Sequence, residues 1–234
     1  MKTYTEHIFE ELIDNSTEAK LKRYLERRRR EHEERENNKL HPKDKNELQD
    51  MIIAAIEKDG PEADLNHIDV SKIDNMNSLF SSYYVGDKYK KELIRSFNGD
   101  ISEWDVSRVT NMRGMFCATK FNGDISGWDV SCVTDMGTMF CGATRFNQDI
   151  SRWEVGSVTN MNGMFYCAIN FNQDISRWEV VSVSDMEDMF NGATSFNQDI
   201  SDWKVDGVDR FDNIFKGCPI KEEFKPKRFQ ERVF

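Results

Sequence analysis

Three polar residue types recur at fixed positions along the chain and offer amide, carboxylate and hydroxyl groups at regular intervals. If the units stack with equivalent atoms about 5 Å apart, each type forms a ladder. An asparagine ladder can hydrogen-bond its neighbours, whereas an aspartate ladder is a row of like charges that needs hydrogen bonds or cations. Every unit shares these columns, which favours aspartates that cap backbone N–H groups in turns over a cation or ligand surface. The columns are Asn98, Asn122, Asn147, Asn172 and Asn197, then Asp100, Asp124, Asp149, Asp174 and Asp199, then Ser102, Ser126, Ser151, Ser176 and Ser201.

A second set of candidate binding residues lies where the regular pattern breaks. An insertion over residues 81–96 is rich in tyrosine and lysine, a composition that suits protein recognition. A solvated loop with a short helix is the equally weighted alternative. Exposed positions that vary from unit to unit add a mixed-charge stripe. The candidate surface comprises Tyr83, Tyr84, Lys88, Tyr89, Lys90, Lys91, Glu103, Arg152 and Arg177.

The residue types needed for most enzymatic chemistry are missing from the regular part of the chain. None of the four histidines falls in residues 97–218, which excludes a histidine-assisted nucleophile or a histidine-ligated metal there. The sequence has no glycine-rich phosphate-binding motif. The five cysteines occupy different columns without CxxC spacing, so they read as small-residue replacements in a reducing compartment rather than a zinc site or disulfide scaffold. We expect no catalytic residue, cofactor or metal.

The charge balance restricts the class of partner. The 234-residue chain has a net charge of −10, and residues 97–218 alone hold 9 basic and 18 acidic residues. Such a surface disfavours nucleic acid and attracts a basic protein. The amino-terminal residues lack the apolar core of a secretory signal, and no apolar run is long enough to span a bilayer.

The elements that would position these columns come from an internal repeat. The tryptophans Trp104, Trp128, Trp153, Trp178 and Trp203 recur with a period of 24 and then 25 residues. A degenerate unit at 62–80 makes six in all. In each unit FNxDIS reads as a one-rung strand, and the VTxMxxMF half has the 3–4 spacing of one or two helical turns, with a threonine or serine at the N-cap position. Tryptophan, phenylalanine and methionine are expected in the core, so the fold predicted is an α/β solenoid of stacked units.

The ends of the chain have a different composition. Residues 1–40 are expected to form a charged helical arm, whose RRRR run at 27–30 is largely neutralised by flanking glutamates. Residues 41–61 should cap the first unit with an amphipathic helix over 43–58 that Gly60 and Pro61 end. The solenoid is expected over 62–218, with a second cap at 219–234 that contains Phe224, Phe229, Val233 and Phe234.

The motif FNxDISxWDVSxVTxMxxMFxGA resembles the repeat of mycoplasma-type lipoproteins and of BspA-like leucine-rich-repeat surface proteins of bacteria, over about residues 62–218. The resemblance implies a leucine-rich-repeat-like solenoid, often on a cell surface, with adhesion or protein binding as its role. The free cysteines favour the cytoplasm instead.

Two classes of function follow from these observations. The first is a non-enzymatic module whose acidic surface binds a protein, with a glycan as a further option. The second is a structural rod that the 1–40 arm anchors in a larger assembly, such as a cell surface, a phage virion or an intracellular complex. The sequence leaves the oligomeric state open.

Overall fold

A computed structural model of the protein describes residues 20–27, 29–30, 37–81 and 87–230. The chain divides into two compact units, residues 1–40 and residues 41–234. Within the first unit, residues 20–27 and 29–30 are helical. The second unit contains helix α3 (Lys45–Asp59), helix α4 (Lys88–Ser96) and two short 3₁₀ helices, η1 (Glu222–Phe224) and η2 (Lys227–Phe229). All of the repeats lie in this second unit.

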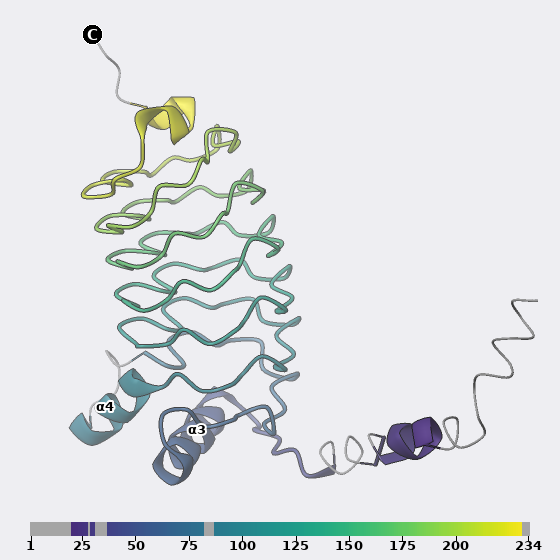
Figure 1. The fold of residues 1–234 in the computed structure, drawn as a ribbon. Coiled ribbons are helices and arrows are strands. Elements are labelled where there is room, and N and C mark those ends of the chain that lie inside the picture. The colour runs from purple at the N-terminus through teal and green to yellow at the C-terminus, as the bar shows by residue number, and fades with distance from the viewer. Residues whose placement is uncertain (1–19, 28, 31–36, 82–86, 231–234) are drawn as a thin grey trace, which may run out of the picture. The chain divides into compact units, whose positions relative to one another are not determined.

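Each repeat forms one coil, and successive coils lie on one another (Figure 1). We number them coil 1 (63–81), coil 2 (97–120), coil 3 (121–145), coil 4 (146–170), coil 5 (171–195) and coil 6 (196–218). One column of residues forms isolated parallel bridges between successive coils: Asn75, Asn111, Asp135, Asn160, Asp185 and Arg210. A further bridge joins Asp64 of coil 1 to Asp100 of coil 2.

The core of the stack consists of aligned aromatic columns. Phe116, Phe140 and Phe165 are fully buried, and their ring centroids follow one another at 5.7 and 5.8 Å. A second phenylalanine of each coil stacks on this column, as Phe146 does on Phe140 at 3.8 Å. The tryptophans are only 3–4% exposed, and each indole N–H donates to a carbonyl of the preceding coil, for example Trp128 to Ile101 O at 3.2 Å. The indoles therefore fill the core and join adjacent coils.

The second half of each coil differs from the helical turns that its spacing predicts. Residues 97–218, all of them described, contain isolated bridges but neither a helix nor a longer strand. Each coil has a position with left-handed φ, between 54° and 62°, and coils 2 to 6 have a second one four residues later, between 54° and 73°. Each of these positions interrupts a right-handed helix. The first position is occupied by Ser78, Gly114, Thr138, Gly163, Asp188 and Asn213, and the second by Ala118, Gly142, Cys167, Gly192 and Gly217.

The N–H groups in this half of the coil bond either the next coil or their own coil. In coil 2, every second N–H donates to a carbonyl of coil 3 at 2.7–2.9 Å, whereas the N–H groups of Met115, Cys117 and Thr119 donate three residues back within coil 2 at 3.1–3.3 Å. The donors to coil 3 are Met112, Gly114, Phe116 and Ala118. The threonines expected as helix N-caps also join coils: Thr134 bonds Thr110 O through both its N–H (2.8 Å) and its hydroxyl (3.1 Å). The segment expected to be helical is thus the one that bonds the coils most densely.

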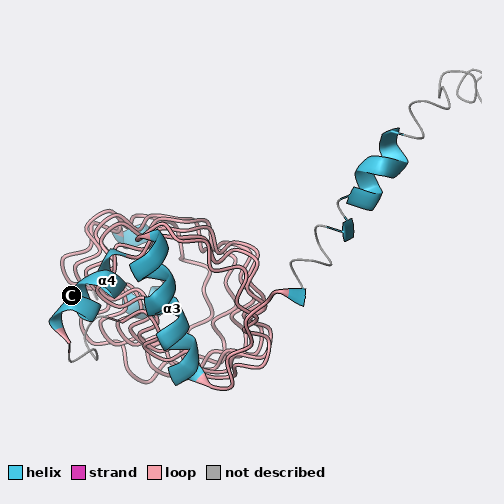
Figure 2. Ribbon diagram, turned by 90° about the horizontal axis from the view of Figure 1, so that it is seen from below, coloured by secondary structure: helices cyan, strands magenta, loops and turns pink. Residues whose placement is uncertain are grey.

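Helix α3 covers the first coil (Figure 2). Asp44 caps its N-terminus by accepting from the N–H groups of Asn46 and Glu47, and the chain turns at Gly60 with φ 85°. Leu48, Ile52, Ile53 and Ile56 are buried. Two further side chains close the carbonyl edge of coil 1, because Lys45 Nζ donates to Asn77 O at 3.1 Å and Gln49 Nε2 to Leu79 O at 2.9 Å.

In the part of the chain that the structure describes, the C-terminal segment contacts both halves of the last coil but bonds its backbone N–H groups only in the first half. Phe224 O accepts from Ile200 N at 2.9 Å, and Phe229 packs on Phe211 with ring centroids 4.9 Å apart. Val233 and Phe234, expected in this cap, lie outside the described residues. The N–H groups of the other half, at positions equivalent to those that join coils 2 and 3, have no acceptor among the described residues. They belong to Phe211, Asn213, Phe215 and Gly217.

Candidate functional site

The asparagine column is a continuous hydrogen-bonded ladder. The Asn98 Oδ1 atom accepts from Asn122 N at 2.7 Å, and Asn122 Oδ1 accepts from Asn147 N at 2.8 Å. Asn147 and Asn172 repeat the contact at 2.9 Å, and Asn197 extends it to Lys221 N in the C-terminal segment at 3.0 Å. Each amide oxygen thus already has a backbone partner, so this column serves the stack itself.

The aspartate column is satisfied inside each coil. The Oδ1 atoms accept from the serine N–H two residues on at 2.9–3.0 Å, in the pairs Asp100–Ser102, Asp124–Ser126, Asp149–Ser151, Asp174–Ser176 and Asp199–Ser201. These serine hydrogen bonds lower the pKa of four of the carboxyls, those of Asp100, Asp149, Asp174 and Asp199. Repulsion from Asp149 acts the other way on the pKa of Asp174 but is a smaller effect. Local hydrogen bonds therefore outweigh the like-charge cost of the ladder.

Lowering the pH should destabilise the stack through these carboxylates. Their pKa is lower in the folded state than the ordinary value of about 3.9, so the unfolded chain binds more protons in this range. Their stabilisation is complete above about pH 5 and disappears as the pH falls through 4 and then through the folded pKa values. Thermal unfolding followed from pH 7 to pH 3 should show the melting temperature falling over that interval.

The matched control is the triple variant Asp149→Asn, Asp174→Asn and Asp199→Asn. Each asparagine retains an oxygen that accepts from the serine N–H but carries no charge that can titrate. The melting temperature of this variant should fall less between pH 5 and pH 3 than that of the wild-type protein. An equal fall in both proteins would contradict the assignment.

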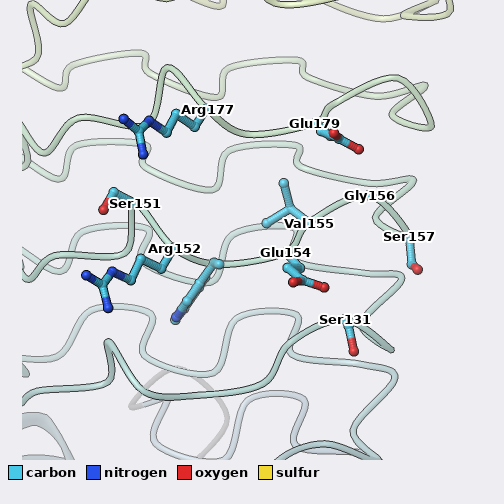
Figure 3. Close-up of a pocket in the computed structure, with 10 residues that line it drawn as sticks. Ser131, Ser151, Arg152, Glu154, Val155, Gly156, Ser157, Arg177 and Glu179 are labelled. Atoms are coloured by element: carbon cyan, nitrogen blue, oxygen red, sulfur yellow. The ribbon is translucent and has the colours of Figure 1, made fainter.

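The variable stripe forms a groove of about 480 Å³ on coils 3 to 5. Figure 3 shows Arg152 and Arg177 on one side of it and Glu154 and Glu179 on the other. The two arginines occupy the same column of coils 4 and 5, and all four side chains belong to exposed residues. Backbone and side chains of neighbouring coils form the floor, including Trp153 and Val155.

The glutamates of the groove lack the serine partner that the aspartates of the same column have in coils 2 and 3. In coil 3, Asp129 accepts from Ser131 N at 3.0 Å and from its hydroxyl at 2.6 Å. In coil 4, Glu154 and Gly156 replace that pair, and a side chain at Gly156 would meet nothing within 4 Å. Within the described part of the chain, none of the groove's two arginines and two glutamates forms a hydrogen bond or an ion pair. Two arginines and two glutamates thus face one hollow without an ion pair between them. After the serine hydrogen bonds, attraction to Arg152 and Arg177 also lowers the pKa of Asp149 and Asp174 respectively.

The other candidate residues lie elsewhere. Tyr89 on α4 is 63% exposed, and Lys88, Lys90 and Lys91 are exposed beside it. Tyr83 and Tyr84 fall outside the described residues. Glu103 shares the arginine column but belongs to coil 2, two coils away from Arg152, and does not line the groove. The structure therefore divides the candidate surface into the arginine–glutamate groove and the basic helix α4, which itself corresponds to the short helix weighed for the insertion.

The serines and the glycine that shape the groove were not identified as site residues from the sequence. Ser131, Gly156 and Ser157 line it, but each belongs to a column that elsewhere forms ordinary turns. The one available signal was the replacement of serine by glycine in coil 4.

The described residues also bear on metal sites and membrane spans. They contain no cluster of three or more histidine, cysteine, aspartate or glutamate side chains able to hold a metal ion. Their helices are all too short or too polar to cross a membrane.

Comparison with known proteins gives one match. The family model described as "Mycoplasma protein of unknown function, DUF285" matches twice, over residues 45–155 and residues 117–226. No curated protein and no solved structure matches the chain.

Proposed function

Because the chain belongs to the DUF285 family of Mycoplasma proteins, whose description assigns no activity, we propose its function from its surface: it is a non-enzymatic protein-binding module. The proposal includes classing the stacked coils as a leucine-rich-repeat-like solenoid, an architecture whose side surfaces commonly bind other molecules. The observation that carries it is the groove, whose four charged side chains form no hydrogen bond or ion pair within the described residues.

The arrangement of charge indicates the chemistry of the ligand. A planar guanidinium binds a carboxylate through two parallel hydrogen bonds, and Arg152 and Arg177 present two of them from adjacent coils. Glu154 and Glu179 face them across the groove and accept from an ammonium or guanidinium group. A polypeptide segment that carries both an acidic and a basic side chain satisfies both rows. A purely acidic or purely basic segment leaves one row uncompensated, which lowers affinity and gives selectivity.

The test is binding of synthetic peptides in four classes, whose members carry acidic, basic, both or neither kind of side chain. We expect the mixed class to bind best, with affinity falling as salt rises. The double variant Arg152→Ser and Arg177→Ser should weaken that binding by about tenfold or more, because charge-assisted pairs are lost. Isothermal titration calorimetry or fluorescence anisotropy measures the change.

Glu103→Gln is the matched control, since it removes a charge in the arginine column outside the groove. It should leave binding unchanged, and circular dichroism should show that all variants remain folded. Equal binding of the four peptide classes, or equal affinity of the arginine variant and the wild-type protein, would refute a groove of this kind. Binding of neutral glycans without binding of peptides would replace a protein ligand with a carbohydrate one.

The separate amino-terminal unit favours a second function, that of a structural component anchored through residues 1–40. Comparing the full chain with a 41–234 truncation separates the two functions. Anchoring predicts that incorporation into the native assembly is lost on truncation while peptide binding remains. If the groove is the only binding surface, the truncated protein should retain both peptide binding and incorporation into the assembly.

The basic helix α4 offers a further contact surface for the same module. Its Lys88, Tyr89 and Lys90 side chains are exposed, whereas Ile94 on the same helix is fully buried. Because Ile94 anchors the helix, charge reversal at Lys88 and Lys90 changes the surface without removing the helix from the stack. A partner that binds equally well to this variant does not use α4.

A further inference from the structure

Two cysteines lie next to each other on neighbouring coils. Cys117 and Cys141 occupy the same column of coils 2 and 3, in the half of the coil where backbone bonds between coils are densest. The residues around Cys117 are tied to coil 3, because Phe116 N donates to Met139 O at 2.9 Å and Ala118 N donates to Cys141 O at 2.7 Å. The backbone therefore holds the two cysteines in register.

The side chains of this pair also meet. The backbone register places the two side chains in the same column of neighbouring coils, and the interaction between the thiols raises the pKa of Cys117. Cys117 is only 7% exposed, whereas Cys141 is half-buried and open to small solutes. By contrast, Cys132 is exposed on another part of coil 3. The pair thus combines one accessible thiol with one protected thiol behind it.

We propose that Cys117 and Cys141 form an oxidation site at which a hydroperoxide produces a disulfide bond between coils 2 and 3. Stacked coils lie about 5 Å apart, which falls within the Cα–Cα separation of about 4.4–6.8 Å that a disulfide spans. The link would join two residues already in contact, so the coils need not move apart or unfold.

The chemistry takes two balanced steps. The Cys141 thiolate attacks the distal oxygen of the hydroperoxide, the O–O bond breaks, and the alcohol or water leaves with the proton, giving a sulfenic acid at Cys141. The Cys117 sulfur then attacks the Cys141 sulfur, the S–O bond breaks, and the hydroxyl leaves as water with the Cys117 proton. Two thiols are oxidised and one peroxide is reduced.

The environment of each thiol suits these different roles. The interaction with Cys117 lowers the pKa of Cys141, which increases the fraction of attacking thiolate. The same interaction, together with burial, raises the pKa of Cys117. Cys117 therefore stays protonated until the sulfenic acid forms beside it, and Cys141 is the residue that meets the oxidant first.

The experiment treats the folded full chain with dilute hydrogen peroxide and maps the products by mass spectrometry without reduction. We expect a linked pair of peptides containing Cys117 and Cys141, formed before Cys132 is oxidised and reversed by dithiothreitol. The crosslink closes a loop of one repeat, so the oxidised protein should melt about 5–10 °C higher than the reduced protein.

Three variants distinguish a paired site from unspecific oxidation. Cys117→Ser should trap a sulfenic acid at Cys141, detected with dimedone, while Cys141→Ser should abolish the melting shift. Cys132→Ser should behave as the wild-type protein. The proposal fails if the wild-type map shows other pairings, or overoxidised cysteines without a 117–141 link. That map needs no substitution, so it decides the matter even where a variant does not fold.

Discussion

Replacing Phe140 with alanine is expected to lower the free energy of unfolding by about 3–5 kcal/mol. The ring is fully buried in coil 3 and lies between Phe116 of coil 2 and Phe165 of coil 4, with Phe146 stacked on it at 3.8 Å. A coil cannot collapse into the vacated space without breaking its backbone bonds to both neighbours, so the cavity should persist. Urea unfolding monitored by tryptophan fluorescence and circular dichroism measures the loss.

The matched control is Phe215→Ala in the same column of coil 6. Phe215 is half-buried and has Phe190 on one side, at 5.9 Å, with Phe229 of the C-terminal segment at 6.3 Å. Its removal should lower the free energy of unfolding by about 1–2 kcal/mol, because a terminal position can relax and part of the ring is already in water. Equal losses at Phe140 and Phe215 would contradict a core whose strength comes from neighbours on both sides.

The second large effect is expected for Gly99→Ala at the start of coil 2. A Cβ atom there would lie 2.0 Å from the carbonyl oxygen of Ala63 and 2.8 Å from Cε2 of Phe97. Coil 2 cannot easily retreat, because Asn98 N bonds Pro61 O at 2.7 Å and Asp100 N bonds Ala63 O at 3.1 Å. We expect a loss of about 2–3 kcal/mol in the free energy of unfolding, measured by urea denaturation.

Gly127→Ala is the comparison for that variant. A Cβ atom at Gly127 meets nothing within 4 Å, so the free energy of unfolding should change by no more than about 0.5 kcal/mol. If both alanines were tolerated equally, the close approach of coil 2 to the Ala63 carbonyl would not be a real constraint on the fold.

Gly99 also shows where reasoning from the repeat alone misleads. Its column contains Gln148, Gln173 and Gln198 in later coils, so the sequence suggests that a side chain is accepted there. In those coils the glutamine amide bonds the preceding asparagine carbonyl, as Gln148 does with Asn122 O at 2.8 Å. Coil 1 is degenerate and brings a different backbone segment against coil 2, a difference that the column cannot reveal.

The repeat period, the buried aromatic columns and helix α3 could all be anticipated, because each follows from the spacing of large apolar residues. The sequence did not reveal that the helical turns expected in each unit would be absent. The first of the two left-handed positions that prevent them is occupied by glycine in only two of six coils, while Ser78, Thr138, Asp188 and Asn213 adopt it elsewhere, and Ala118 and Cys167 adopt the second. Hydrogen bonds between coils select that backbone, and they depend on residues about 25 positions away.

The groove was only partly foreseeable for a similar reason. Arg152 and Arg177 stood out because they vary in an otherwise regular column, but the same argument selected Glu103, which lies outside the groove. What separates them is the hollow that residues of coils 3 to 5 line. Its shape depends on distances between side chains of different coils, which a single sequence does not specify.

Every interior coil bonds its two neighbours through the same backbone positions: in coil 3, Thr134 N donates to Thr110 O of coil 2 and Met136 N donates to Asn160 O of coil 4. If one unit were duplicated and the copy inserted between two such coils, the copy would find the same backbone donors and acceptors on both sides as the original unit. Helix α3 and the C-terminal segment would keep their own partners. Gene duplication can therefore lengthen or shorten the molecule in steps of one coil, about 5 Å each, without redesigning either end.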